Sequence, residues 1–422
     1  MIQTQITMHY NSSYYKSNMA AFYIVVIFLF FDGIRSNVIY REYLTLIREA
    51  ALFFLIYRVI NLQPHKINLP YSLRFFILDY TFVAIFSFLQ LGDGPISTNF
   101  IVKPYEFVAT IYVFYNFEKL TNRTYTKLVK YILYTSIVFC VVDVMLYFIP
   151  LPIWNRESFW WGRVSCGYPT MDVVTLSYTL ILLIYYPYST ITGFAKIVSI
   201  VINIVCLILN FSGTGMVLLV IIISVSLLLN IKNQNKKIIW VVLGLFVTGA
   251  SSSLVYFRSN FGEAYENGTM LIQNKYDIIM GNNMSKYAHN TIELRETRFE
   301  HVKQRQNTLM QSYVGMGLNN MSMDRETLRR NPKAYSMENQ YLNLILSNGY
   351  IGLCLYIFIM MELLYITVKM KIGFNLKVML LLSLIIWALN SYTLLTLMLF
   401  SNSVYLAFYI AAILRLKKGK QI

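Results

Sequence analysis

The stretch FAKIVSIVINIVCLILNFSGTGMVLLVIIISVSLLLN, residues 194–230, contains two apolar runs on either side of the small-residue turn 212–215. Lys196 is the one charged side chain in it. An α-helix rises 1.5 Å per residue, so roughly 20 residues cross the roughly 30 Å hydrocarbon core of a bilayer. Each run is close to that length. The stretch therefore predicts two membrane helices joined by a tight turn.

The whole chain shares the character of this stretch. Of its 422 residues, 57% are hydrophobic and 13% are charged. An average soluble domain is about 45–50% apolar and about 25% charged. The mean hydropathy of +0.52 agrees. This composition cannot supply a water-facing surface, so it excludes soluble, fibrous, disordered and disulfide-scaffold proteins.

The apolar runs predict an all-α polytopic membrane protein with about twelve transmembrane helices. Since the first run is followed by no small-residue cleavage site, we interpret it as a retained membrane helix. The predicted spans are 19–35, 43–60, 73–91, 99–117, 128–149, 171–190, 194–211, 213–230, 238–256, 343–367, 374–393 and 396–414.

The loop charges predict the orientation. The net charge is +16, and in a membrane protein such an excess usually reflects Lys and Arg kept in cytoplasmic loops, not nucleic-acid binding. On a twelve-helix count every basic group falls on one side, so both termini are predicted to be cytoplasmic. The groups are Arg58/Lys66/Arg74, Lys119/Arg123/Lys127/Lys130, Lys196, Lys232/Lys236/Lys237, Lys369/Lys371/Lys377 and Arg415/Lys417/Lys418/Lys420.

The predicted organisation has three parts. Residues 1–256 carry helices one to nine, with a Trp-rich external loop at 150–170. Residues 257–339 form a long, partly helical and more polar external loop, and residues 340–422 carry the last three helices and a basic cytoplasmic tail. Loops this long usually carry function, so the chemistry is predicted to face outward.

Within the long loop, residues 291–310 (TIELRETRFEHVKQRQNTLM) predict a helix. At 100° per residue, Arg295, Arg298 and Arg305 fall within an arc of roughly 80°. Guanidinium groups bind phosphate or pyrophosphate by paired, charge-assisted hydrogen bonds, so this stripe is a candidate pyrophosphate site. The alternative is a solvated helix stabilised by i,i+4 charge pairs.

Two further features lie between this helix and the return into the membrane. Gly315 and Gly317 favour a tight turn or a close backbone approach, and are only a weak phosphate-loop signal. Glu338 lies at the outer membrane boundary near a helix N-terminus. It is either a capping carboxylate that complements the helix dipole or a general base close to the arginines.

Several charged residues fall inside the predicted spans, where they are costly unless paired or hydrated. Arg48 with a carboxylate, or Asp79 with Lys103, are plausible bridges between helices, and an ion or proton pathway is the alternative. The full set is Arg48, Glu49, Asp79, Lys103, Glu106, Asp143 and Glu362. The four histidines form no ligand cluster, so neither a metal site nor another cofactor is predicted.

Three stretches together resemble the O-antigen polymerase and ligase superfamily of bacterial membrane glycosyltransferases, whose fold is of the GT-C type. Their order and spacing span roughly residues 155 to 355. The stretches are Arg163-Val-Ser-Cys-Gly167-Tyr-Pro169, Arg298-Phe-Glu-His followed by Gly315-Met-Gly317, and Glu338-Asn-Gln-Tyr341-Leu followed by Gly349 and Gly352. Ligases usually have His where this chain has Glu338, which favours a polymerase. The Ser-Arg pair common at the inner helix turn is here Ser212-Gly213.

The resemblance implies a reaction on the outer face of the bacterial inner membrane. A glycan on undecaprenyl pyrophosphate is transferred to a hydroxyl of another lipid-linked repeat unit, making O-antigen or capsular chains. Arg163 and Arg298 would grip the pyrophosphates, with Arg295, Arg305 and Tyr341 in support. Glu338 would be the base, and no metal is required because pyrophosphate is a good leaving group. A flippase and a chain-length regulator are the implied partners.

Three other functions remain open at this stage. An O-antigen ligase would use the same chemistry with a lipid A core as acceptor. A lipid-linked oligosaccharide flippase or an ion-coupled transporter would also have about twelve helices. The long loop at 257–339 argues against a flippase, which needs only short external loops.

Overall fold

The computed structural model describes residues 2–35, 41–61, 67–89, 98–148, 169–188, 191–210, 213–229, 308–318, 339–393 and 400–420, with residues 244, 249, 300, 302, 306, 396 and 397. Thirteen helices make up its regular structure within these ranges. They are α1 (Ile2–Arg35), α2 (Arg41–Asn61), α3 (Tyr71–Leu89), α4 (Thr98–Tyr115), α5 (Phe117–Thr121), α6 (Tyr125–Phe148), α7 (Pro169–Tyr185), α8 (Gly193–Leu209), α9 (Gly213–Leu229), α13 (Leu309–Val314), α15 (Gln340–Lys369), α16 (Phe374–Thr393) and α17 (Phe400–Lys417).

Most of the predicted spans coincide with these helices, which confirms the all-α class. The ninth span, 238–256, lies outside the described residues except for positions 244 and 249. The first boundary was wrong, because α1 begins at Ile2 and not near residue 19. Residues 2–10, IQTQITMHY, precede the apolar run and belong to the same helix.

Several helices can cross a bilayer, so the protein is a polytopic membrane protein, although the count of twelve spans is not confirmed. Four described helical segments are long and apolar enough for a full crossing: Ser13–Phe30, Tyr125–Met145, Gln340–Lys369 and Phe374–Tyr392. Three shorter apolar segments are Val173–Tyr185, Gly193–Ile208 and Thr214–Leu229.

The surface of α3 indicates a lipid environment. One face of α3 exposes a continuous stripe of large apolar side chains at three- and four-residue spacing: Phe75, Leu78, Phe82, Ile85 and Leu89. A soluble protein rarely exposes so long an apolar stripe. Exposure of this stripe to lipid carries no free-energy penalty, because the surrounding acyl chains are also apolar. The opposite face of α3 packs into the protein.

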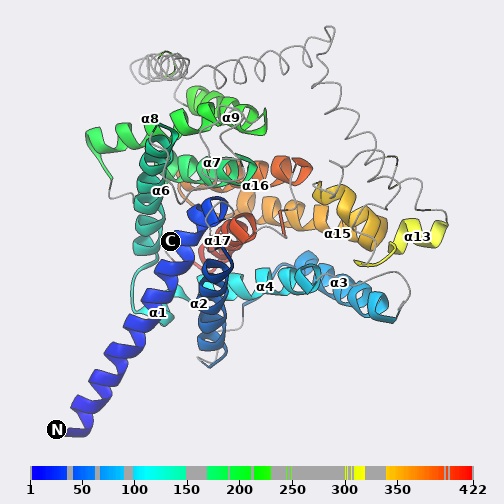
Figure 1. Ribbon diagram of the computed structural model, residues 1–422, viewed down its shortest axis with the longest axis horizontal. Coiled ribbons are helices and arrows are strands. Elements are labelled where there is room, and N and C mark those ends of the chain that lie inside the picture. The colour runs from blue at the N-terminus through cyan, green and yellow to red at the C-terminus, as the bar shows by residue number, and fades with distance from the viewer. Residues whose placement is uncertain are drawn as a thin grey trace.

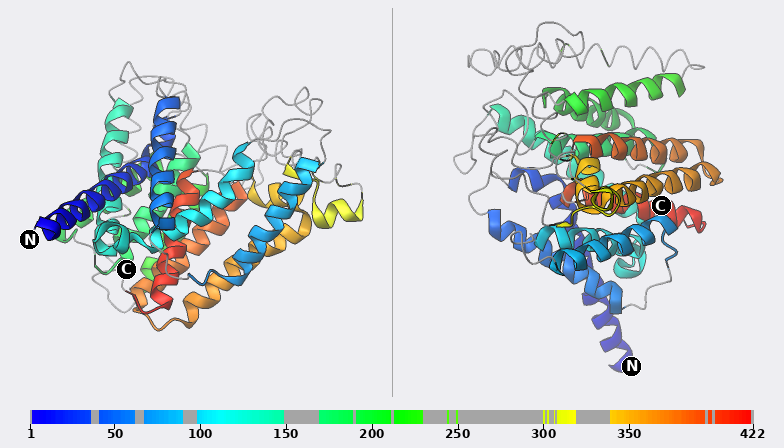
Figure 2. Two further views of the ribbon diagram at one scale, coloured as in Figure 1. Left: turned by 90° about the horizontal axis from the view of Figure 1, so that it is seen from below. Right: turned by 90° about the vertical axis from the view of Figure 1, so that its right-hand side faces the viewer.

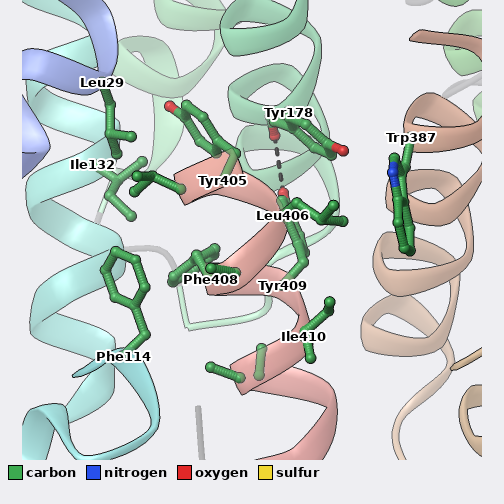
Figure 3. Close-up of a cluster of buried hydrophobic side chains, with 14 of the residues drawn as sticks. Leu29, Phe114, Ile132, Tyr178, Trp387, Tyr405, Leu406, Phe408, Tyr409 and Ile410 are labelled. Atoms are coloured by element: carbon green, nitrogen blue, oxygen red, sulfur yellow. Dashed lines mark hydrogen bonds between the residues drawn. The ribbon is translucent and has the colours of Figure 1, made fainter. Parts of the chain in front are cut away.

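The centre of the bundle is formed around α17, which lies between α4, α7 and α1. Tyr405 stacks on Tyr178 of α7 with ring centroids 5.4 Å apart. The Tyr409 hydroxyl donates to the Tyr178 carbonyl at 3.2 Å, which removes a buried polar group from the apolar core (Figure 3). At the end of α17, Arg415 is buried and pairs with Glu118 at 2.7 Å.

One pair of helices positions the segment 308–318. Figures 1 and 2 show α3 and α15 side by side at one end of the molecule, with α13 beyond them. The two helices run antiparallel. The start of α3 contacts Glu362 late in α15, whereas Ser87 near the end of α3 contacts the external residue Leu318.

Candidate functional site

The external helix predicted at 291–310 is interrupted before its end. The Gln306 amide donates to the Val302 carbonyl at 3.2 Å, as in an α-helix. A new helix, α13, then begins, because Thr308 and Gln311 exchange hydrogen bonds as a capping box. The prediction of one continuous helix was therefore wrong at its C-terminal end: the Thr-x-x-Gln sequence caps a separate helix.

After α13 the chain lies directly on the first turns of α15. The Met316 amide donates to the Leu346 carbonyl at 2.9 Å, and the Gly317 amide donates to the Ser347 carbonyl at 3.1 Å. Both acceptors are backbone carbonyls of a membrane helix, which would normally bond within the helix. The segment 308–318 is thus joined to α15 through the backbone itself.

These carbonyls are available because α15 is broken at Gly349. Its φ of 65° and ψ of −165° are non-helical, so the helical hydrogen bonds of the preceding turn are interrupted. An unsatisfied carbonyl in a membrane costs several kcal/mol, and protein groups must replace the lost partner. The prediction of one unbroken helix over 343–367 is therefore wrong at Gly349, where Asn348-Gly349 is a turn-type dipeptide that signals the break.

Two glycines make the contact possible. A Cβ at Gly315 would lie 2.2 Å from the Ser347 carbonyl oxygen, and one at Gly349 would lie 2.3 Å from the Tyr313 carbonyl oxygen. Both residues also have positive φ angles, 86° and 65°. The sequence-based interpretation of Gly315 as a site of close backbone approach is confirmed.

A buried serine on α3 holds the end of the segment. The Ser87 hydroxyl accepts a hydrogen bond from the Leu318 amide at 2.7 Å. Gly317 passes so close that a Cβ there would lie 2.7 Å from the Ser87 oxygen. No feature of the sequence distinguishes Ser87 from other serines in apolar helices, so only the tertiary structure reveals this contact.

A second anchor joins α15 to the residues before α13. The Gln306 side-chain amide donates to the Ile345 carbonyl at 2.7 Å. One turn earlier, buried Val302 packs with buried Leu346 in a small apolar cluster separate from the main core. Residues 302 and 306 therefore contact α15 with one common face.

Of the predicted site residues, Tyr341 lies within the described part of the chain. Its hydroxyl donates to the Ala388 carbonyl of α16 at 2.8 Å, and its ring lies edge-on to Tyr356. It thus holds α15 against α16, whatever it contributes to substrate binding. The other predicted site residues lie outside the described residues: Arg163, Arg295, Arg298, Arg305 and Glu338.

Charged side chains join α2 to α4 inside the membrane region. The Lys103 ammonium group lies 3.1 Å from a Glu49 carboxylate oxygen and 2.6 Å from one of Glu106. Arg48 also pairs with Glu49. Two positive and two negative charges thus balance one another, which confirms structural pairing for these residues. The pair that joins two helices is Lys103 with Glu49, because Arg48 pairs with Glu49 on its own helix.

Asp79 and Glu362 serve a different helix pair. The suggested Asp79–Lys103 bridge was wrong, because Asp79 instead accepts a hydrogen bond from the Asn348 side chain at 2.9 Å. Glu362 accepts from the Ser72 amide and hydroxyl at 2.8 Å and 2.6 Å, which caps the N-terminus of α3. Both carboxylates therefore join α3 to α15.

Replacing Lys103 by methionine is expected to destabilise the protein by about 3–5 kcal/mol, because it leaves two carboxylates buried together without their shared cation. The measurement is the thermal unfolding midpoint of the purified protein in detergent. Exposed Lys119 provides the control: Lys119→Met should stay within about 0.5 kcal/mol of wild type. Equal midpoints for the two variants would contradict the structural role of Lys103.

These features define a polytopic helical membrane protein in which the segment 308–318 is anchored on a broken membrane helix. Residues 198–357 match the protein family described as O-antigen ligase. This part of the chain, which begins within α8 and includes α9, α13 and the break in α15, is similar to that family of membrane enzymes, which transfer glycans. The resemblance seen in the sequence is thereby confirmed at the level of the family. No curated protein matches the chain.

Proposed function

We propose that this protein is a polysaccharide polymerase. It joins oligosaccharide repeat units carried on undecaprenyl pyrophosphate into O-antigen or capsular chains on the outer face of the bacterial inner membrane. Family membership already implies lipid-linked glycan substrates. The acidic Glu338 at a position that is usually histidine in ligases favours the polymerase within that family.

The observation that carries the proposal is the contact of residues 302 and 306 with α15. On a helix of 100° per residue, the arginines 295, 298 and 305 all lie within about 60° of Val302. If the helix continues as predicted, the arginine stripe shares the face that is turned to α15. This arrangement supports pyrophosphate binding over the membrane and disfavours a merely solvated helix.

In the sequence, the candidate base directly precedes the helix that this anchor contacts. Glu338 directly precedes Asn339, whose side chain caps α15 by accepting from the Leu342 amide. Ile345, the partner of Gln306, lies seven residues further along, which is about 10 Å of helix. In the proposed function, the carboxylate acts at the sugar end of the glycosyl pyrophosphate and the guanidinium groups bind its pyrophosphate end.

The proposed step transfers the glycan from phosphate to sugar. A hydroxyl oxygen of the acceptor attacks the anomeric carbon, the bond from that carbon to the phosphate oxygen breaks, and undecaprenyl pyrophosphate departs. Glu338 accepts the hydroxyl proton, as a positioned general base. Arg163 and Arg298 stabilise the negative charge that develops on the leaving pyrophosphate, with Arg295 and Arg305 in support.

The charge distribution of the described helices supports an external reaction. Arg74 and Lys369 lie at the ends of α3 and α15 opposite the external segment, which contacts Ser87 and the first turns of α15. Since basic loops remain in the cytoplasm, segment 308–318 is on the outer side in this proposal. Both termini are then cytoplasmic.

The test is glycan profiling of a strain that lacks the gene, with and without complementation by the wild-type gene. A polymerase predicts that single repeat units replace long chains in the deletion strain. Long lipid-linked chains that never reach their final acceptor would instead identify a ligase. Repeat units that accumulate on the cytoplasmic face would identify a flippase, and either result would refute the polymerase.

A further inference from the structure

Asp79 is a carboxylate that the proposed chemistry does not use. It lies on α3, where its Oδ2 accepts a hydrogen bond from Asn348 Nδ2 at 2.9 Å. Asn348 is the residue immediately before the break in α15 and is fully buried. Gly352, one turn later, leaves room for this contact, because a Cβ there would lie only 3.3 Å from the same carboxylate oxygen.

From Asn348 the hydrogen bonds continue to the external segment. The Ser347 hydroxyl donates to the Asn348 side-chain oxygen at 2.7 Å. The Ser347 carbonyl in turn accepts from the Gly317 amide at 3.1 Å. An unbroken path of three hydrogen bonds thus joins the Asp79 carboxylate to the external backbone.

The position of Asp79 along α15 explains how a charge is tolerated there. The part of α15 after the break runs from Tyr350 to Lys369 and rises about 30 Å, the thickness of the hydrocarbon core. With basic Lys369 at the inner end, the break falls at the outer boundary. A carboxylate beside the N-terminus of this half-helix is favoured by the helix dipole.

We infer that Asp79 is a positioning residue for the transfer reaction. It holds Asn348 and the broken turn of α15 in the conformation that the external segment requires. The same contact holds residues 302 and 306, which belong to the predicted arginine helix, against α15. Asp79 acts through Asn348 and Ser347, without touching substrate. The expected effect of Asp79 on enzyme kinetics rests on the proposed function. Its expected effect on the contact between residues 302 and 346 does not.

Disulfide trapping tests the structural consequence without any substrate. Val302→Cys and Leu346→Cys place two thiols in the packed apolar contact, in a chain whose native cysteines are replaced by alanine. In membrane vesicles, Asp79→Leu should slow disulfide formation about tenfold, as expected for loss of a hydrogen bond to a charged group. The exchange Asp79→Asn with Asn348→Asp restores a donor and an acceptor, and should return the rate to within about threefold of wild type.

Glu362→Leu is the matched control, since Glu362 also joins α3 to α15 but at the opposite end. It should leave the trapping rate unchanged, even if less protein accumulates. Equal slowing by Asp79→Leu and Glu362→Leu would show a general packing effect and overturn the inference. Failure of the exchange to restore trapping would overturn it as well.

Kinetics with lipid-linked repeat units extracted from the deletion strain test the functional consequence. If Asp79→Leu lowers the fraction of seated enzyme tenfold, the KM should rise about tenfold while kcat at saturation changes little. A fall in kcat at unchanged KM would show that Asp79 acts in catalysis or only in folding, which contradicts a positioning role. Slowed trapping in a protein that never polymerises would refute the proposed function alone.

Discussion

Arg298→Ala is expected to lower the rate of polymer formation about 10³-fold, which in cells leaves single repeat units in place of long chains. The physical reason is that negative charge develops on the departing pyrophosphate. Removing one preorganised donor to such a charge typically costs about 10²–10³ in rate. The measurement is the ladder of glycan lengths in the deletion strain carrying the variant, normalised to the amount of protein in the membrane.

Two further variants make this result specific. Arg298→Lys keeps the charge but loses the paired hydrogen bonds of the guanidinium group, so its activity should fall between those of alanine and wild type. Arg123→Ala removes an exposed arginine near the N-terminus of α6, which is the cytoplasmic end in the proposed orientation. It should support chains of normal length. Normal chains in the Arg298→Ala strain would refute the assigned role of Arg298.

Gly349→Ala is expected to abolish polymer formation by preventing the external segment from seating on α15. The residue has a φ of 65°, and an added Cβ would lie 2.3 Å from the Tyr313 carbonyl oxygen. Backbone strain of this kind costs about 1–3 kcal/mol before any clash is counted. The measurement is the rate of disulfide trapping between cysteines at 302 and 346, together with the glycan ladder.

Gly373 is the matched control, because it lies in the connection between α15 and α16 and a Cβ there would meet nothing within 4 Å. Gly373→Ala should leave both the trapping rate and the chain length unchanged. Gly315→Ala should slow trapping and abolish polymer formation as Gly349→Ala does. Each of these two glycines lies against the backbone of the other segment, so a Cβ at either position blocks the same contact. Normal trapping in Gly349→Ala would contradict the structural account of the break.

The positions of the helices were largely predictable. In a bilayer, an apolar run of about 20 residues must form hydrogen bonds with all its backbone amides and carbonyls. The α-helix is the structure that satisfies these groups within one segment. The stretch 194–230 illustrates this, because its two runs correspond to α8 and α9. The structure ends α8 at Leu209 and begins α9 at Gly213, so three of the four residues of the predicted turn 212–215 belong to α9.

The partners of the charged side chains were less predictable. The sequence offered Asp79 and Lys103 as a bridge because both lie in spans and have opposite charge. The structure pairs Lys103 with Glu49 and Glu106, and Asp79 with Asn348. Partner choice depends on how α2, α3, α4 and α15 pack around each other, and residue spacing along a single helix carries no such information.

By itself, the sequence determined the membrane environment, the helical class and the family that residues 198–357 resemble. Composition decides the first two, since so few charged side chains cannot cover a water-facing surface, and the order of short motifs indicates the third. Only the tertiary structure decided that α15 breaks at Gly349 and that the external segment satisfies the carbonyls exposed there. A broken membrane helix is tolerated only where another part of the chain replaces its lost hydrogen bonds. The residues that replace them are separated from the break by thirty positions or more, so packing alone brings them together.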